Sequence, residues 1–212
     1  INDALVGDPL DLKMFAFSNW ILEEANEAIA PIIIRPPGSE SFDLDDAINS
    51  SDDEQESQDV SDMPPLEEMG VIRCFEFNAT IRRMSVVVRE LESERSAVMT
   101  KGSPETIKTI CAPHTIPSDY DQTLARYSHA GYRVIACAYK PLPTGTTWLK
   151  VQRMLREQVE GDLQFLGFLL FENKLKERTT PIIRSLAVAG IQTVMVTGDN
   201  LYTAVAVARA CG

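Results

Sequence analysis

The sequence predicts an α+β fold, an antiparallel sheet flanked by helices, followed by a truncated α/β segment. Three observations predict it. Short runs rich in β-branched residues follow one another closely between residues 71 and 101, which favours an antiparallel meander. Helical patterns come next, and helices beside such a sheet define the α+β class. From Leu163 a nearly continuous apolar run and then helices and a second apolar run follow, which is typical of a parallel sheet.

The N-terminal part predicts a helix and one or two short strands. Leu10–Phe17 is amphipathic, and Asp8 or Pro9 would begin its helix. Trp20–Ala30 fits either a strand or a short helix. Ile32–Ile34 is a short apolar run before two prolines.

Residues 38–63 form an acidic insert. Ten acids and no Lys or Arg lie between Gly38 and Asp62, so this insert accounts for nearly all of the net charge of −11. It is too poor in apolar residues to offset the cost of ordering, and we expect it to be disordered. Ser50 and Ser51 each have an acid three residues on, a pattern that suits an acid-directed kinase but occurs often by chance.

The middle of the chain predicts the sheet and its helices. The expected strands are Val71–Phe77, Met84–Glu90, Ala97–Lys101 and Tyr132–Tyr139. The expected helices are Pro104–Cys111, Asp119–Ala130 with Ser118 as its cap, and Trp148–Val159.

The C-terminal part predicts a second domain. Leu163–Phe171 and Thr193–Val196 would be buried parallel strands, each followed by a helix: one from Pro181, capped by Thr180, and one over Leu201–Ala210. We therefore expect two domains, residues 1–160 and a partial domain over 161–212.

Composition excludes several classes of function. No basic stripe offsets the acids, so a nucleic-acid partner is not expected. The four cysteines and two histidines lack metal-ligand spacing, so no metal site is expected in the chain. The longest apolar run is far shorter than the roughly 20 residues of a membrane helix, and we expect a soluble, monomeric fragment.

Two turns carry candidate chemistry. Lys101-Gly102-Ser103-Pro104-Glu105 places a lysine before a capped helix, a combination that suits an anion such as phosphate. Thr197-Gly198-Asp199 follows the predicted Thr193–Val196 strand, where α/β sheets bind ligands. By itself, the first turn is better explained by an ordinary surface lysine before a helix, and the second fits a simple helix cap about equally well. Phe77 could stack on a base, but a core phenylalanine is the plainer interpretation. Arg133 could reach either a phosphate or a surface carboxylate.

The order of these motifs resembles the P-type ATPases. Gly7-Asp8-Pro9 with Asp11, Phe75-Glu76-Phe77 with Met84-Ser85-Val86, the Lys101 turn, Gly131-Tyr132-Arg133 and Thr197-Gly198-Asp199-Asn200 are similar to that family's series, running from the nucleotide-binding domain into the phosphorylation domain. Leu10–Met14 and Glu172–Lys176 resemble the type-five, subgroup B pumps, which export polyamines from late endosomes, lysosomes or vacuoles into the cytosol. The C-terminal segment would then be haloacid-dehalogenase-like.

The resemblance implies roles for individual residues. Phe77 would stack on adenine, Lys101 would lie at the floor of the pocket, and Gly102 would let the nucleotide approach the backbone. Asp11 would contact the adenine region or the lysine, and Arg133 the phosphates. Thr197, Gly198 and Asp199 would face the γ-phosphate during transfer, with Mg²⁺ bridging phosphate oxygens.

Two departures from the family pattern modify this expectation. Ala79 stands where some pumps carry an arginine, which predicts weaker nucleotide binding. The Asp-Lys-Thr-Gly-Thr stretch with the phosphorylated aspartate is not in the sequence. We therefore expect a fragment that binds ATP without hydrolysing it, and that works with the remaining phosphorylation, actuator and membrane domains of a pump on an endomembrane. The alternatives are a stand-alone haloacid-dehalogenase-type phosphatase and a non-enzymatic acidic interaction module.

Overall fold

The computed structural model describes residues 5–24, 32–37, 68–172, 174–198 and 200–212. These residues fall into two compact units. The first comprises Ile1–Arg73, Val87–Ser96 and Pro143–Gln152, and the second comprises Cys74–Val86, Ala97–Leu142 and Arg153–Gly212. The acidic insert with Ser50 and Ser51 lies outside the described residues, and so does Asp199.

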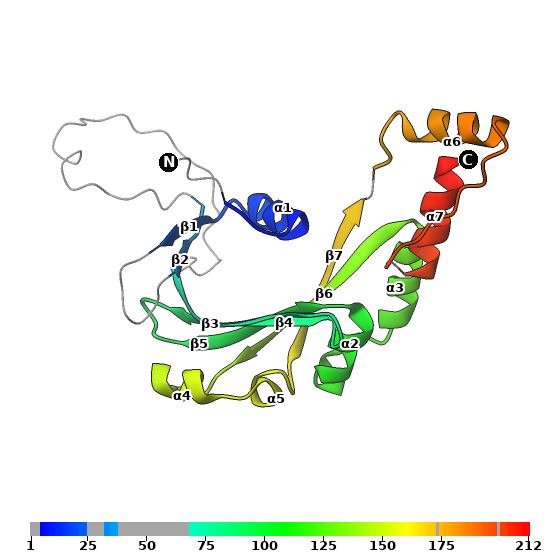
Figure 1. Ribbon diagram of the computed structural model, residues 1–212. Coiled ribbons are helices and arrows are strands. Elements are labelled where there is room, and N and C mark those ends of the chain that lie inside the picture. Colours follow the sequence, from blue (N-terminus) through cyan, green and yellow to red (C-terminus); the bar gives the residue numbers. More distant parts are fainter. Residues whose placement is uncertain (1–4, 25–31, 38–67, 173, 199) are drawn as a thin grey trace, which may run out of the picture. The chain divides into compact units, whose positions relative to one another are not determined.

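The strands form one seven-stranded sheet in which strand order follows the chain (Figure 1). The strands are β1 Ile21–Glu24, β2 Ile32–Arg35, β3 Met69–Asn78, β4 Arg83–Glu90, β5 Ser96–Gly102, β6 Tyr132–Pro141 and β7 Gln164–Glu172. The antiparallel meander predicted from the sequence is confirmed, and the ambiguous stretch after Trp20 begins as a strand.

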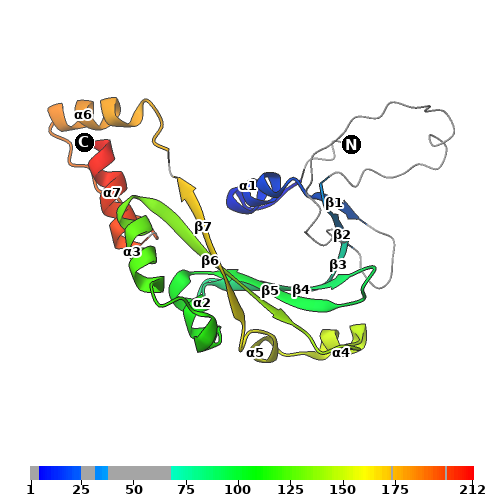
Figure 2. The same ribbon diagram turned by 180° about the vertical axis from the view of Figure 1, so that it is seen from behind.

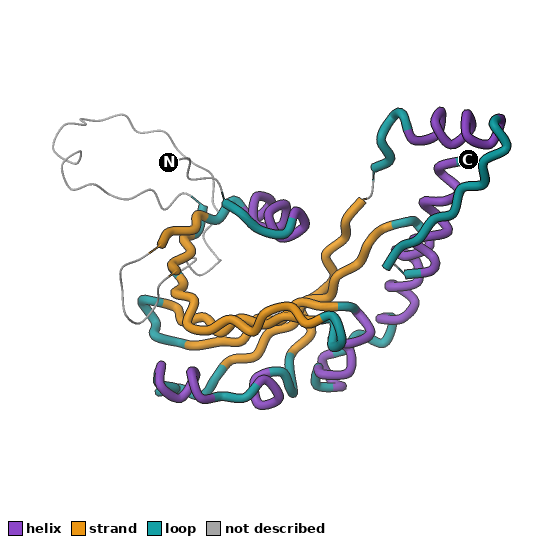
Figure 3. Tube along the Cα trace, viewed as in Figure 1, coloured by secondary structure: helices purple, strands orange, loops and turns teal. Residues whose placement is uncertain are grey.

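Seven α-helices and one 3₁₀ turn accompany the described strands, and Figure 3 colours helices purple and strands orange. They are α1 Pro9–Ser18, α2 Pro104–Ile110, the 3₁₀ turn Pro113–Thr115, α3 Tyr120–His129, α4 Trp148–Arg153, α5 Arg156–Val159, α6 Thr179–Val188 and α7 Leu201–Cys211.

Side-chain caps explain the starts of α1, α2 and α7. Asp8 caps α1 by accepting a hydrogen bond from the Leu10 amide, and Asn200 caps α7 by accepting from the Tyr202 amide, both at 2.9 Å. Three predictions were wrong in detail. Asp119, not Ser118, is the N-cap of α3, and Arg178, not Thr180, precedes α6. The single helix expected over Trp148–Val159 is two short helices, because the backbone turns extended at Leu155.

In the first unit, side chains tie irregular segments to the strands. Arg35 on β2 forms ion pairs with Glu23 at 3.1 Å and Glu68 at 2.9 Å. Arg73 on β3 donates hydrogen bonds to the Val151 and Gln152 carbonyls of α4 at 2.9 and 2.7 Å. These guanidinium contacts satisfy carbonyl groups at the end of α4 that would otherwise lack partners.

In the second unit, α2 and α3 pack against β6, and α7 packs against α3 (Figures 1 and 2). The core includes side chains with no exposed surface: Val98, Ile107, Ala136, Val159 and Leu163. Tyr120 lies at the start of α3 with its ring 5.0 Å from Phe165 and 4.8 Å from Phe168 on β7. This aromatic cluster fixes α3 to the last strand.

The predicted parallel sheet from Leu163 onward is wrong for the described residues. β7 runs antiparallel to β6, with Arg133 opposite Phe171 and Cys137 opposite Gly167, so the meander extends to Glu172. Residues 191–197 form no strand, and Val194 and Val196 are 78% and 92% exposed. A parallel strand needs neighbours to bond its backbone, and none of the described strands pairs with this segment. The boundary at residues 160–161 stays a prediction.

None of the described helices has the length and apolar character needed to cross a membrane.

Candidate functional site

The turn between β5 and α2 has the predicted local structure. Ser103 is the N-cap of α2, and its hydroxyl oxygen accepts a hydrogen bond from the Thr106 amide at 3.4 Å. Pro104 occupies the first helical position and Glu105 the first turn. Lys101 therefore sits at the end of a strand, immediately before a rigid turn.

Lys101 lies directly opposite Cys137 in the β5–β6 register, so their side chains emerge on the same face. The lysine charge acts on two thiols. Burial raises the pKa of Cys137, while the Lys101 cation lowers it. Burial and Glu76 raise the pKa of Cys74 to about 11 against the opposing effect of Arg156 and Lys101. The Lys101 charge thus acts on thiols of both β3 and β6.

Phe77 is near the end of β3 and is 60% exposed, whereas Phe75 is only 8% exposed. The ends of β3 and β5 meet at one edge of the sheet, because the Ser103 amide donates a hydrogen bond to the Arg82 carbonyl in the β3–β4 turn at 3.0 Å. With β4 between them, β3 and β5 are two strand spacings apart, about 10 Å. An exposed aromatic ring and a lysine are therefore available at the same edge.

Arg133 is exposed on β6, near the same edge. Ala136 is opposite Gly102, so Arg133 lies three residues, roughly 10 Å, beyond the end of β5. Arg133 and Cys137 have the same parity without an irregularity between them, which places Arg133 on the Lys101 face. Gly131 ends α3 just before it, with a φ of 88° that favours glycine.

Close packing, which the sequence did not reveal, requires glycine at position 102. A Cβ atom there would lie 2.7 Å from the Arg82 carbonyl oxygen, 2.7 Å from the Arg83 Cβ and 3.0 Å from the Arg83 Cα. The β3–β4 turn occupies the space that a side chain would need. This close approach explains the glycine without any ligand.

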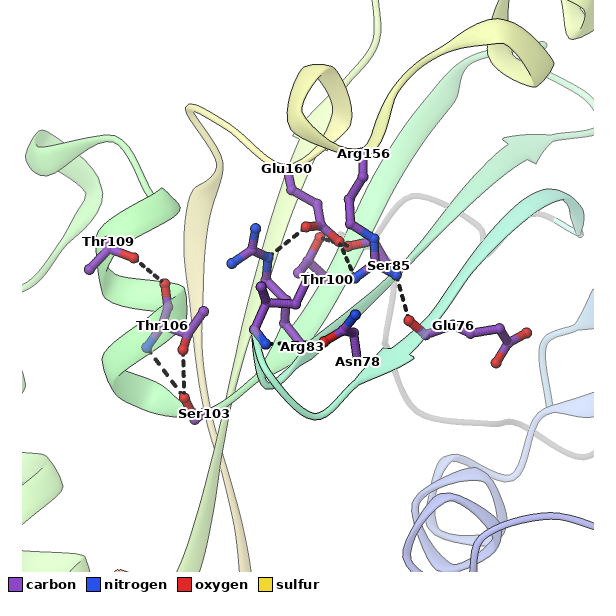
Figure 4. A network of polar contacts seen from close by, with 11 residues as sticks. Glu76, Asn78, Arg83, Ser85, Thr100, Ser103, Thr106, Thr109, Arg156 and Glu160 are labelled. Atoms are coloured by element: carbon purple, nitrogen blue, oxygen red, sulfur yellow. Dashed lines mark hydrogen bonds and ion pairs between the residues drawn. The ribbon is translucent and has the colours of Figure 1, made fainter.

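Behind the edge lies a buried polar network that the sequence analysis missed (Figure 4). The Glu160 side chain, just after α5, has no exposed surface. Its carboxylate accepts a hydrogen bond from Arg83 Nε at 2.5 Å and another from Ser85 Oγ at 2.7 Å. Arg156 Nη1 lies 3.6 Å from Glu160 Oε1. Ser85 had been singled out through the Met84-Ser85-Val86 motif, but Glu160 had not, because nothing in the local sequence links residues 75 positions apart.

The network continues to residues beside the candidate site. Ser85 uses its single proton on Glu160, so the Thr100 hydroxyl donates to Ser85 Oγ at 2.9 Å. Arg156 donates to the Glu76 carbonyl, and its guanidinium lies 5.7 Å from the Phe75 ring centroid. Thr100 precedes Lys101, and Glu76 precedes Phe77.

The Thr197–Asp199 turn does not have the predicted strand before it in the described structure. Thr197 and Gly198 are exposed and follow an irregular segment instead of a strand, and no atom lies within 4 Å of the Gly198 Cβ position. Asp199 lies outside the described residues. Asp11 is on α1, in the first unit.

The residues present suit a nucleotide better than a bare metal ion. Among the described residues, no group of three or more His, Cys, Asp or Glu side chains could hold a metal. A solvent-exposed ring together with Lys101 and Arg133 suits a base and a phosphate chain. Any Mg²⁺ would then enter with the phosphates.

Comparison with known proteins identifies the family. The family model for the P-type ATPase cytoplasmic domain N matches residues 47–178. The chain belongs to the P-type ATPases and comprises part of their cytoplasmic domain N. Its relatives are pumps of the type-five, subgroup B group.

Several relatives are similar along the whole chain. The polyamine-transporting ATPase 13A3 of Mus musculus is 42% identical over 219 residues, all of this chain and 18% of the relative. The vacuolar cation-transporting ATPase YPK9 of Saccharomyces cerevisiae is 42% identical over 221 residues, all of this chain and 15% of the relative. The polyamine-transporting ATPase 13A2 of Homo sapiens is 41% identical over 218 residues, all of this chain and 17% of the relative. The chain thus spans less than a fifth of these relatives.

Proposed function

We propose that this chain is the ATP-binding part of an endomembrane polyamine or cation pump, and that ATP binds at the edge formed by the ends of β3 and β5 and the start of β6. The observation that carries the proposal is the Phe77 ring, 60% exposed at the sheet edge where the Lys101 turn also lies. A large apolar ring exposed to solvent gains free energy when a base stacks on it.

Each residue has a distinct task in this proposal. Phe77 supplies the stacking surface for adenine. Lys101 stabilises negative charge at the floor of the site, and Arg133, farther along the same face of the sheet, binds the phosphate chain through its planar set of donors. Gly102 fixes the turn by packing against Arg83. Asp11 is proposed to contact the adenine region, the role that the family resemblance implies.

The bound nucleotide would be presented to an aspartate of the pump outside this chain. Phosphoryl transfer depends mainly on positioning and charge stabilisation, so this chain contributes by holding the base and orienting the phosphates. Thr197, Gly198 and Asp199 are proposed to face the γ-phosphate. Mg²⁺ bound to the phosphates would supply charge neutralisation.

The names of the relatives support transport of polyamines or other cations, and the vacuolar name of the yeast relative supports a location on the cytosolic face of a vacuole, lysosome or late endosome.

The test is an ATP titration of the 212-residue chain, followed by calorimetry and amide chemical shifts. We expect shifts at Phe77, at residues 101–105 and at Arg133. Phe77→Ala should weaken binding about 5- to 150-fold, since base–aromatic stacking contributes about 1–3 kcal/mol. Lys101→Ala should weaken it at least about 10-fold, because a hydrogen bond to a charged group contributes about 1.5–3 kcal/mol.

Matched controls separate the loss of a binding residue from the general effect of removing an exposed apolar or charged side chain. Ile182→Ala removes another exposed apolar side chain, on α6, and Lys174→Ala removes the charge of an 82% exposed lysine. Both controls should keep the affinity of the parent. A folded chain that does not bind ATP at millimolar concentration, or equal losses in variants and controls, would refute the proposed site.

A further inference from the structure

We propose that Glu160 is a positioning residue for the nucleotide site, because one buried carboxylate holds the backbone segments that carry both Lys101 and Phe77. This inference rests on the proposed function. It concerns only the second unit, which contains Glu160, all its partners and both site residues.

The first connection leads to Lys101. Glu160 accepts from Ser85 Oγ at 2.7 Å, and Ser85 accepts from the Thr100 hydroxyl at 2.9 Å. Ser85 is 1% exposed and Thr100 is 3% exposed, so water cannot readily replace either hydrogen bond. The chain of hydroxyl groups thereby fixes β5 one residue before Lys101.

The second connection leads to the turn that follows Lys101. Glu160 binds Arg83 Nε at 2.5 Å, and the Cα and Cβ atoms of Arg83 fill the space beside Gly102. The preceding residue, Arg82, has a φ of 48°, which is uncommon for a residue with a side chain, and its carbonyl accepts from the Ser103 amide. Holding Arg83 therefore holds the turn against the end of β5.

The third connection leads to Phe77. Arg156 lies 3.6 Å from Glu160, donates to the Glu76 carbonyl and faces the Phe75 ring at 5.7 Å. These two residues immediately precede Phe77. The three connections are visible together in Figure 4, where Arg83, Ser85 and Arg156 converge on Glu160.

The chemistry of this network favours positioning over simple stability. Burying an ion pair costs desolvation that an apolar pair avoids, so such pairs contribute little net stability. Two partly exposed guanidinium groups surround one fully buried carboxylate. These contacts fix the orientation of each side chain, which apolar packing would not do. Small displacements of binding groups have large effects on affinity and rate. A network that holds Lys101 and Phe77 in place would therefore favour nucleotide binding.

The experiment compares ATP affinity and thermal stability in Glu160→Gln and Leu163→Ala. Glutamine keeps the size of the side chain but removes the charge that Arg83 and Arg156 face. Leu163 is a fully buried core residue of the same unit, and Leu163→Ala should lower Tm without changing ATP affinity. We expect Glu160→Gln to weaken ATP binding about 10-fold and to shift the amide signals of Phe77, Lys101 and Gly102 in the absence of nucleotide. Glu160→Asp, which keeps the charge, should recover part of the loss.

Ser85→Ala provides a milder test if Glu160→Gln does not fold. It removes only the hydroxyl that joins Glu160 to Thr100, and should weaken ATP binding about 3-fold with a shifted Lys101 amide. The inference would be overturned if folded Glu160→Gln bound ATP with an affinity within 2-fold of the parent. If only Ser85→Ala folds, the same result in that variant would overturn it. Either result would leave the proposed function intact. Failure of the parent itself to bind ATP would instead refute the proposed function.

Discussion

Gly102→Ala tests whether the glycine of the Lys101 turn is required by packing. The added Cβ would lie 2.7 Å from the Arg82 carbonyl oxygen and 2.7 Å from the Arg83 Cβ. Comfortable contacts between such atoms are about 3.5–4.0 Å, so the turn must move by roughly 0.8 Å or more. The obstructing atoms belong to the backbone and to a Cβ, which cannot swing aside as a flexible side-chain end could.

We expect Gly102→Ala to lower the free energy of unfolding by about 1–3 kcal/mol, the usual range for overpacking. For a chain of this size, that corresponds to a fall in Tm of about 2–12 °C. The assay is urea and thermal unfolding beside Gly198→Ala, because no atom lies within 4 Å of the Cβ position of Gly198. The control should be neutral, or stabilising by up to about 1 kcal/mol through the unfolded chain.

Equal stability of Gly102→Ala and its control would refute the packing argument. If Gly102→Ala also kept its stability but lost ATP binding, the glycine would be needed for approach of the nucleotide to the backbone, as the family resemblance implied.

Two further predictions concern the core of the second unit. Tyr120→Phe removes the hydroxyl that donates to the Pro104 carbonyl at 2.8 Å, and loss of this buried hydrogen bond should cost about 1–2 kcal/mol in urea unfolding; a change below about 0.3 kcal/mol would contradict the argument. Burial raises the pKa of the Cys111 thiol from 9.0 to about 11, so the folded state holds this proton more tightly than the unfolded state. The protonated thiol therefore contributes to the free energy of unfolding below pH 9. This contribution, at most roughly 2–3 kcal/mol, is lost as the pH rises toward 11. Cys111→Ala should therefore lose less stability than the parent between pH 8 and 11, and identical pH profiles would count against this assignment.

Much of the fold could be predicted because its signals are local. The Ser103-Pro104 start of α2, the Asp8 cap of α1 and the Asn200 cap of α7 depend on a few neighbouring residues. The close spacing of the strands likewise indicated the meander, since antiparallel neighbours need only short connections. The break between α4 and α5 was missed because the apolar pattern continues through it.

The candidate site was only partly predictable. The Lys101 turn, Phe77 and Arg133 are visible as sequence motifs, and the structure places all three near one edge of the sheet. Their roles in binding stay predictions, as do those of Asp11 and the Thr197–Asp199 turn. Glu160 gave no signal, because its partners Arg83 and Ser85 lie 77 and 75 residues away.

The sequence by itself determined the antiparallel sheet with its helices, the order of elements as far as β6, and the family, because caps, strand patterns and ordered motifs depend on neighbouring residues. Only the tertiary structure decided which strands pair and which distant side chains contact one another. An apolar run such as Phe165–Phe171 predicts a buried strand, but the side-chain pattern alone does not say which strand it pairs with. β7 proved antiparallel to β6, and it is not buried among the described residues, since Leu166 is 65% exposed. The need for Gly102 and the network around Glu160 likewise depend on close contact between distant segments, and such contacts exist only once the chain has folded.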